Sequence, residues 1–137
     1  MTAQTFPRRI LLVEADKFRH DFLQAIADAD VDATPDPDQA IGWLQETVYS
    51  DLWLNHDLGC EPKNGRDVSK WLCAHPLAQP WLRIRVHSMN PVSAPKIVNE
   101  LLLAGRPAKL KPLAELAEEY TRHYLEAQKA RMTVIDG

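Results

Sequence analysis

Short apolar runs alternate with segments of helical periodicity along this chain. The clearest runs are residues 10–13 and 52–54, each bounded by polar or charged residues. A continuous apolar run of this length suits a strand that is buried on both faces, as in a parallel sheet. Between the runs, apolar residues recur every three or four positions, which is the spacing of a helix packed on one side. The alternation predicts a three-layer, doubly wound α/β fold with a five-stranded parallel sheet.

The expected strands lie within residues 9–13, 31–35, 51–57, 81–88 and 107–112, and the expected helices within 16–27, 38–44, 68–74, 92–104 and 113–131. Asp16 and Asp38 are the expected N-caps of the first two helices. Arg83 and Arg85 alternate with apolar residues, which predicts either a strand near the sheet edge or arginines that bind an anion or a partner. We expect one domain over residues 1–137, with a core from about residue 8 to about residue 126.

Composition and charge bear on where the protein is located and on what it binds. No apolar run approaches the roughly 20 residues that cross a bilayer, and the first residues lack the apolar segment of a signal peptide. Cys60 and Cys73 show no metal-ligand spacing, so we expect reduced thiols. These features predict a cytoplasmic protein with no membrane partner. The formal net charge of −3 gives no overall attraction to long nucleic acid, which favours a small nucleotide or a short RNA end as ligand.

Polar side chains gather where the expected strands end. Carboxyl ends of parallel strands share one edge of the sheet, and doubly wound folds bind ligands there. We therefore expect the candidate site at this edge. Its residues are Glu14 and Asp16 after the first strand, His56 and Asp57 after the third, His87, Ser88 and Asn90 after the fourth, and Lys109 and Lys111 at the fifth.

Two imidazoles in this set suit proton transfer. His56 and His87 can supply a general acid and a general base, because free imidazole exchanges protons near neutral pH. Asp57 can orient one ring, provided that the strand has ended before it, since neighbours on a regular strand point to opposite faces. The remaining groups are suited to phosphoryl oxygens: Ser88, Asn90 and Lys111, with Arg19 and Lys63 as further candidates.

The order of these residues resembles the response-regulator receiver fold, a flavodoxin-like fold with strand order 2-1-3-4-5. In that family an acidic pair follows the first strand, a phosphoacceptor Asp ends the third, a Ser or Thr ends the fourth, and Lys-Pro ends the fifth. Glu14, Asp57, Ser88 and Lys111 match these positions. Ala15 stands where the second acid belongs, unless Asp16 replaces it by a local shift. The alanine speaks against ordinary Mg²⁺ binding, because hard cations need several oxygen ligands.

The stretches "NHDLG" and "VHSMNP" are more similar to the cyclic-phosphate-processing receiver-like domains, an offshoot of the receiver fold placed in RNA repair settings. The similarity spans roughly residues 51–103, and "EADKFR" retains Asp16 and Arg19 of a further motif. It implies a phosphoesterase that opens a 2′,3′-cyclic phosphate on RNA or a cyclic nucleotide by two-histidine acid/base catalysis. The implied catalytic residues are His56, Asp57, His87 and Ser88, and the implied substrate-binding residues are Asn90, Lys111, Asp16, Arg19 and Glu14.

Two other functions stay open. The histidines and Asp57, with Glu14 or Asp16, would form a mixed nitrogen and oxygen set for Zn²⁺, Mn²⁺ or Fe²⁺, although no HxH or HExxH spacing supports a metal-dependent hydrolase. A receiver without its acidic pair can also persist as a non-catalytic module that binds a nucleotide or a protein. We expect no required cofactor, with a divalent metal as the alternative, and a homodimer through the end of the terminal helix as a further alternative.

Overall fold

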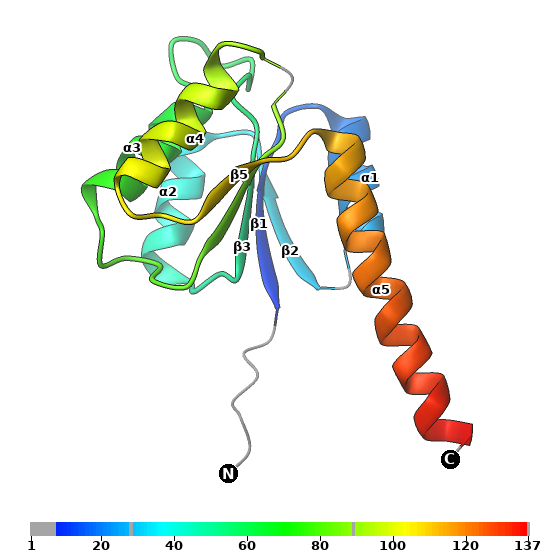
Figure 1. Cartoon of the computed structure of the whole chain (residues 1–137). Helices are drawn as coiled ribbons and strands as arrows, with labels where there is room; N and C mark the ends of the chain where they lie inside the picture. Colours follow the sequence, from blue (N-terminus) through cyan, green and yellow to red (C-terminus); the bar gives the residue numbers. More distant parts are fainter. Residues whose placement is uncertain (1–7, 28, 89, 137) are drawn as a thin grey trace.

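The computed structural model describes residues 8–27, 29–88 and 90–136. It consists of a five-stranded parallel sheet in the order β2-β1-β3-β4-β5 with helices on both faces (Figure 1). The predicted architecture and strand order are confirmed. The elements are β1 (Arg9–Val13), α1 (Lys17–Ile26), β2 (Asp30–Thr34), α2 (Pro37–Glu46), β3 (Asp51–Leu54), α3 (Gly65–Ala74), β4 (Arg83–Val86), α4 (Ser93–Leu103), β5 (Ala108–Leu110) and α5 (Leu113–Asp136).

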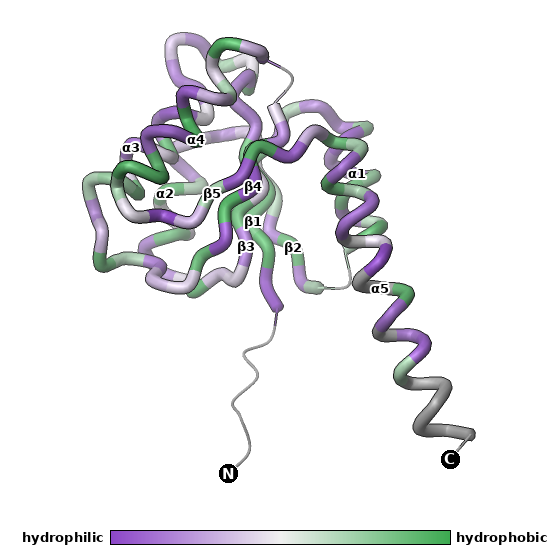
Figure 2. The backbone as a smooth tube through the Cα atoms, viewed as in Figure 1, coloured by the Kyte–Doolittle hydropathy of each residue, from purple (hydrophilic) through white to green (hydrophobic). Residues whose placement is uncertain are grey.

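The sheet separates two apolar cores, because successive side chains of a strand point to opposite faces. One core packs strand residues such as Leu54 and Val86 against α2, α3 and α4. The other packs Leu12 and Trp53 against Leu23 of α1 and Leu116 of α5. Figure 1 shows these two groups of helices on opposite sides of the sheet, and Figure 2 shows β1 as a hydrophobic stretch with a hydrophilic beginning.

The first turns of α1, α2 and α3 are capped by short polar side chains. Asp16 caps α1 as predicted, since its carboxylate accepts from the Arg19 backbone N–H at 3.0 Å. The prediction for α2 is wrong by two residues: Asp36 is the cap, because Pro37 starts the helix and needs no hydrogen-bond partner for a backbone N–H. Asn64 caps α3.

The fourth strand lies near a sheet edge, as one of the two alternatives predicts. β4 lies between β3 and the edge strand β5, and each of its two arginines faces an acidic side chain. Arg83 pairs with the buried Asp51 at 2.9 Å. The guanidinium of Arg85 is buried beneath α5, where it lies 3.7 Å from Glu119. The alternation of arginines therefore reflects ion pairs with neighbouring elements.

Three further observations complete the fold. The terminal helix runs to Asp136, past the predicted end at 131, and extends well beyond the sheet in Figure 1. Cys60 and Cys73 are both free thiols. Within the described parts of the chain, no helix combines the length and apolar character needed to span a membrane.

Candidate functional site

The carboxyl ends of the strands form one rim, as the sequence predicts. Parallel backbone pairing continues one residue past each strand: the Asn55 N–H donates to the Val13 carbonyl at 3.0 Å, and the His87 N–H donates to the Leu54 carbonyl at 3.0 Å. This register sets Glu14, Asn55 and His87 side by side at the end of β1, β3 and β4. The residue directly after β3 is thus Asn55, and Asp57 follows two positions later.

Glu14 is buried at the centre of this row. Its Oε2 accepts from the Asn55 amide at 2.8 Å and from the Ala15 backbone N–H at 2.9 Å, and its Oε1 lies 3.0 Å from His87 Nε2. Burial raises the pKa of the Glu14 carboxyl, but the hydrogen bonds from His87 and Asn55 outweigh burial and hold that pKa below its ordinary value. Glu14 is therefore held as a carboxylate.

His87 is closed off from solvent, with no exposed side-chain surface. Its Nε2 must carry a proton, because the Glu14 carboxylate can only accept. Its Nδ1 is also buried and has no hydrogen-bond partner among the described residues. A ring with no exposed surface cannot touch a ligand in this conformation, so His87 contacts the rim through Glu14.

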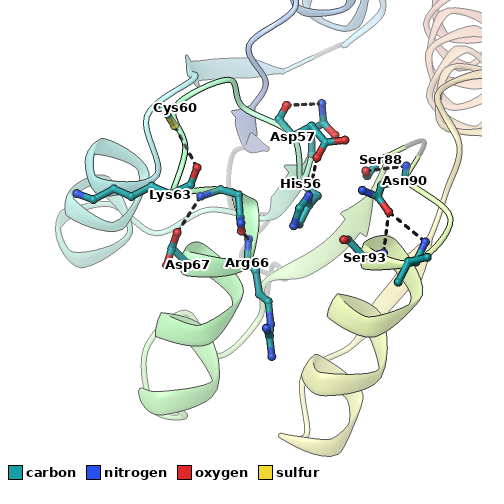
Figure 3. A network of polar contacts seen from close by, with 12 residues as sticks. His56, Asp57, Cys60, Lys63, Arg66, Asp67, Ser88, Asn90 and Ser93 are labelled. Carbon is teal, nitrogen blue, oxygen red and sulfur yellow. Dashed lines mark hydrogen bonds and ion pairs between the residues drawn. The ribbon is translucent and has the colours of Figure 1, made fainter.

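His56 and Asp57 form a second, open pair. His56 Nδ1 lies 2.7 Å from Asp57 Oδ1, with side-chain exposures of 14% and 61%. β3 ends at Leu54, before both residues. The two side chains can therefore meet, which neighbours within a regular strand cannot do. Figure 3 shows the His56 ring pointing between the first turns of α3 and α4, which carry Arg66 and Ser93.

Gly65 holds the backbone that carries this pair. Its N–H donates to the His56 carbonyl at 2.9 Å, so the start of α3 lies directly on the exit of β3. A Cβ at position 65 would lie 2.0 Å from the Asn55 carbonyl oxygen, a distance that no side chain tolerates. Glycine is therefore required for the turn that directs His56 and Asp57 toward each other.

The two imidazoles do not share one side of the rim. Strand alternation places Asn55 and His87 on the face of Trp53 and Arg85, toward α1 and α5, whereas His56 lies on the opposite face, against α3. The expectation that both rings converge on one anion is therefore not supported. The sequence alone could have predicted this separation. Alternate residues of a strand share a face, so Asn55 lies on the face of Trp53, and His87 lies on the face of Arg85.

Ser88 and Asn90 shape the turn before α4. The Ser88 hydroxyl accepts from the Asn90 N–H at 3.1 Å, and the Asn90 side-chain oxygen accepts from the N–H groups of Val92 and Ser93 at 3.1 and 2.9 Å (Figure 3). Both side chains border the rim on the same side as His56. Met89 lies outside the described residues.

Two of the lysine candidates, Lys111 and Lys63, have acidic partners elsewhere in this structure. Lys111 Nζ lies 3.4 Å from Glu119 of α5, the same carboxylate that faces Arg85. Lys63 forms an ion pair with Asp38 at the start of α2. Neither ammonium group is brought together with the histidines.

A pocket of about 410 Å³ opens at the α1 side of the rim. Among the described residues that line this pocket, Arg19 is the one with a positively charged side chain. Its guanidinium lies 3.9 Å from the Glu14 carboxylate. The three carboxylates around it already have partners: Glu14 has His87, Asp57 has His56, and Asp16 has the first turn of α1. The guanidinium is thus the group that an anion in this pocket would meet. The lining residues are Glu14, Ala15, Asp16, Arg19, Asn55 and Asp57.

The donor set does not fit the divalent cation that receiver domains bind at this rim. Both oxygens of Glu14 already accept hydrogen bonds, and Ala15 offers no side-chain oxygen. Across residues 8–136, as far as they are described, no three His, Cys, Asp or Glu side chains lie close enough together to hold a metal ion.

The fold is similar to that of solved receiver domains. A CheY-like response regulator receiver domain from Methanospirillum hungatei JF-1 is 17% identical, with 91% of this chain and 99% of that chain covered and a TM-score of 0.64. The signal receiver domain of an HD domain-containing protein from Pseudomonas fluorescens Pf-5 is 14% identical, with 99% and 97% covered and a TM-score of 0.69. Likeness at these identities shows the fold alone.

Sequence comparison identifies the family more narrowly. No curated protein is similar enough in sequence to count as a relative. The family described as the cyclic-phosphate processing receiver domain matches residues 12–102, which is more than half of the 137 residues. This match includes Glu14, Arg19, the His56–Asp57 pair and His87. The chain therefore belongs to the family of cyclic-phosphate processing receiver domains.

Proposed function

We propose that this domain is a phosphoesterase that opens a cyclic phosphate on a nucleotide or at an RNA end. The observation that carries the proposal is the His56–Asp57 pair, with its 2.7 Å contact: Asp57 lines the same pocket as Arg19, and the His56 ring lies on the other side of Asp57, outside that lining. An imidazole oriented by a carboxylate and an anion-binding guanidinium are two of the parts that such a reaction needs. Membership of the family supports the same class of substrate.

His56 is the proton-transfer group in this proposal. Asp57 accepts from Nδ1–H, because a carboxylate has no proton to give, and this leaves the lone pair of the ring on Nε2. Nε2 takes a proton from water as the water oxygen forms its bond to phosphorus. The ring P–O bond then breaks, and the leaving oxygen takes a proton from solvent to give a phosphomonoester and a free hydroxyl.

Arg19 binds the phosphate oxygens from the other side of Asp57. Its backbone is fixed by the Asp16 cap, and its side chain is kept near the rim by Glu14 at 3.9 Å. A guanidinium is suited to this role because its fork of donors matches phosphate geometry.

His87 acts as a positioning residue in place of the second catalytic imidazole. It holds Glu14 in place, and Glu14 in turn fixes Asn55 and faces Arg19. Ser88 and Asn90 contribute the turn that borders the site, and Lys111 joins the substrate only after it leaves Glu119.

A non-catalytic binding module is the second candidate. The observation that favours it is the engagement of His87, Ser88 and Asn90 in internal hydrogen bonds. Incubation of the purified domain with 2′,3′-cyclic nucleotides, with and without EDTA, separates the candidates. Turnover that survives EDTA and is lost in His56→Ala supports the proposal, turnover lost with EDTA supports a metal-dependent hydrolase, and binding without turnover supports the binding module.

The cytoplasmic location, a protein partner and a homodimer through the end of α5 stay predictions. Analytical ultracentrifugation of the whole chain tests the dimer directly.

A further inference from the structure

Two large aromatic side chains lie exposed on α1. Phe18 is 76% exposed and Phe22 is 39% exposed. Their rings are nearly parallel, with 9° between the planes and 6.4 Å between the centroids. One turn of helix thus presents a stacked aromatic pair whose outer face is open to solvent.

This pair belongs to the helix whose first turn borders the candidate site. Phe18 belongs to the first turn of α1, between Asp16 and Arg19, both of which line the 410 Å³ pocket. Figure 1 shows α1 beginning at the edge where β1 ends. Helical side chains lean toward the N-terminus of their helix, and the N-terminus of α1 is its end at the rim, so this tendency directs Phe18 and Phe22 toward the rim although neither lines the pocket itself.

We propose that Phe18, backed by Phe22, is the platform on which the base of a nucleotide stacks while Arg19 binds its phosphate. This inference rests on the proposed function and narrows its substrate to nucleotides and RNA ends that carry an accessible base. Every base has a π-face, and stacking on an aromatic side chain is a common means of holding unpaired nucleotides.

The polar groups around the platform indicate that a base would be held by stacking and not recognised through hydrogen bonds to its edge. Lys17 and Asp21 flank the aromatic pair and are 3.5 Å from each other, and Asp21 also accepts from His20 at 3.0 Å. These polar groups are thus engaged with one another. We expect all four bases to bind, with purines tighter than pyrimidines because their rings are larger.

The test compares ligands that differ only in the base. Binding of 2′,3′-cyclic AMP and of glycerol 1,2-cyclic phosphate, which has the five-membered cyclic phosphate but no base, is titrated by calorimetry. The protein is the whole chain carrying His56→Ala, so that turnover does not consume the ligand. Further variants are Phe18→Ala, Phe18→Trp and, as a control for loss of exposed apolar surface, Leu103→Ala, whose side chain on α4 is 89% exposed.

We expect Phe18→Ala to weaken 2′,3′-cyclic AMP binding about tenfold and to leave the baseless ligand unchanged. Phe18→Trp should retain or tighten nucleotide binding, and Leu103→Ala should change neither ligand. Equal affinity of Phe18→Ala and its parent for the nucleotide overturns the platform, and so does an equal loss for both ligands. Opening of the baseless compound by the chain with native His56 is measured separately, so failure of the platform and failure of the proposed reaction are distinguished.

Discussion

His87 Nε2 lies 3.0 Å from Glu14 Oε1, and the two side chains are 0% and 1% exposed. This buried contact joins the end of β4 to the end of β1 across β3. The sequence predicts both residues as members of the site, but in the structure they are buried and support the rim from inside. The groups left open to a ligand are Arg19, His56 and Asp57.

Loss of the His87 ring should destabilise the fold. His87→Ala leaves a buried carboxylate with one partner fewer, and we expect the free energy of unfolding to fall by about 3 kcal/mol. Urea denaturation measures the change. His20→Ala removes an exposed imidazole contact and serves as the control, with a change below about 0.5 kcal/mol. Equal stability of the two variants would show that the buried contact contributes little.

Stability should depend on the ionisation of Glu14. The folded-state pKa of Glu14 lies below its ordinary value of 4.5, so the folded state favours the carboxylate. This contribution is fully present above the unfolded pKa and is lost as the pH falls below about 4.5 and through the folded pKa. Unfolding free energies measured between pH 7 and pH 3 should therefore fall more steeply for the native chain than for Glu14→Gln. Parallel curves would contradict the assignment.

Gly65 allows a direct comparison with Gly42. A Cβ at position 65 meets the Asn55 backbone oxygen at 2.0 Å, whereas a Cβ at position 42 of α2 meets nothing within 4 Å. Gly65→Ala should lower the unfolding free energy by about 3 kcal/mol and displace His56. Gly42→Ala should raise it by up to about 1 kcal/mol through helix propensity. Thermal or urea unfolding of both variants measures these changes. An unchanged free energy of unfolding in Gly65→Ala would contradict the close packing.

Lys111 should become available when its partner on α5 is removed. Glu119→Gln weakens the 3.4 Å contact that keeps the ammonium group away from the rim. We expect affinity for inorganic phosphate to rise about threefold to tenfold, because a released cation increases the local positive charge. Glu118→Gln removes an exposed charge one position earlier and is the control. If the double variant Glu119→Gln/Lys111→Ala keeps the higher affinity for phosphate, Lys111 is not the cause of the increase.

Much of the architecture was predictable from the chain because buried parallel strands read as continuous apolar runs. The gathering of Glu14, His56, His87 and Lys111 at one edge followed from strand direction alone. Which of them face one another did not, because that depends on where each strand ends. Asn55 was missed because an amide after an apolar run reads as the start of a loop. The diversion of Lys111 to Glu119 depends on how α5 packs, which periodicity does not specify.

The proposed reaction depends most on His56. The deciding measurement is the steady-state rate at which 2′,3′-cyclic AMP is opened in EDTA by the native chain, by His56→Ala and by Asp57→Asn. We predict turnover by the native chain, a loss of at least about a hundredfold in His56→Ala with folding and ligand binding retained, and a smaller loss in Asp57→Asn. Absence of turnover by the native chain, or an undiminished rate in His56→Ala, would contradict the proposed reaction.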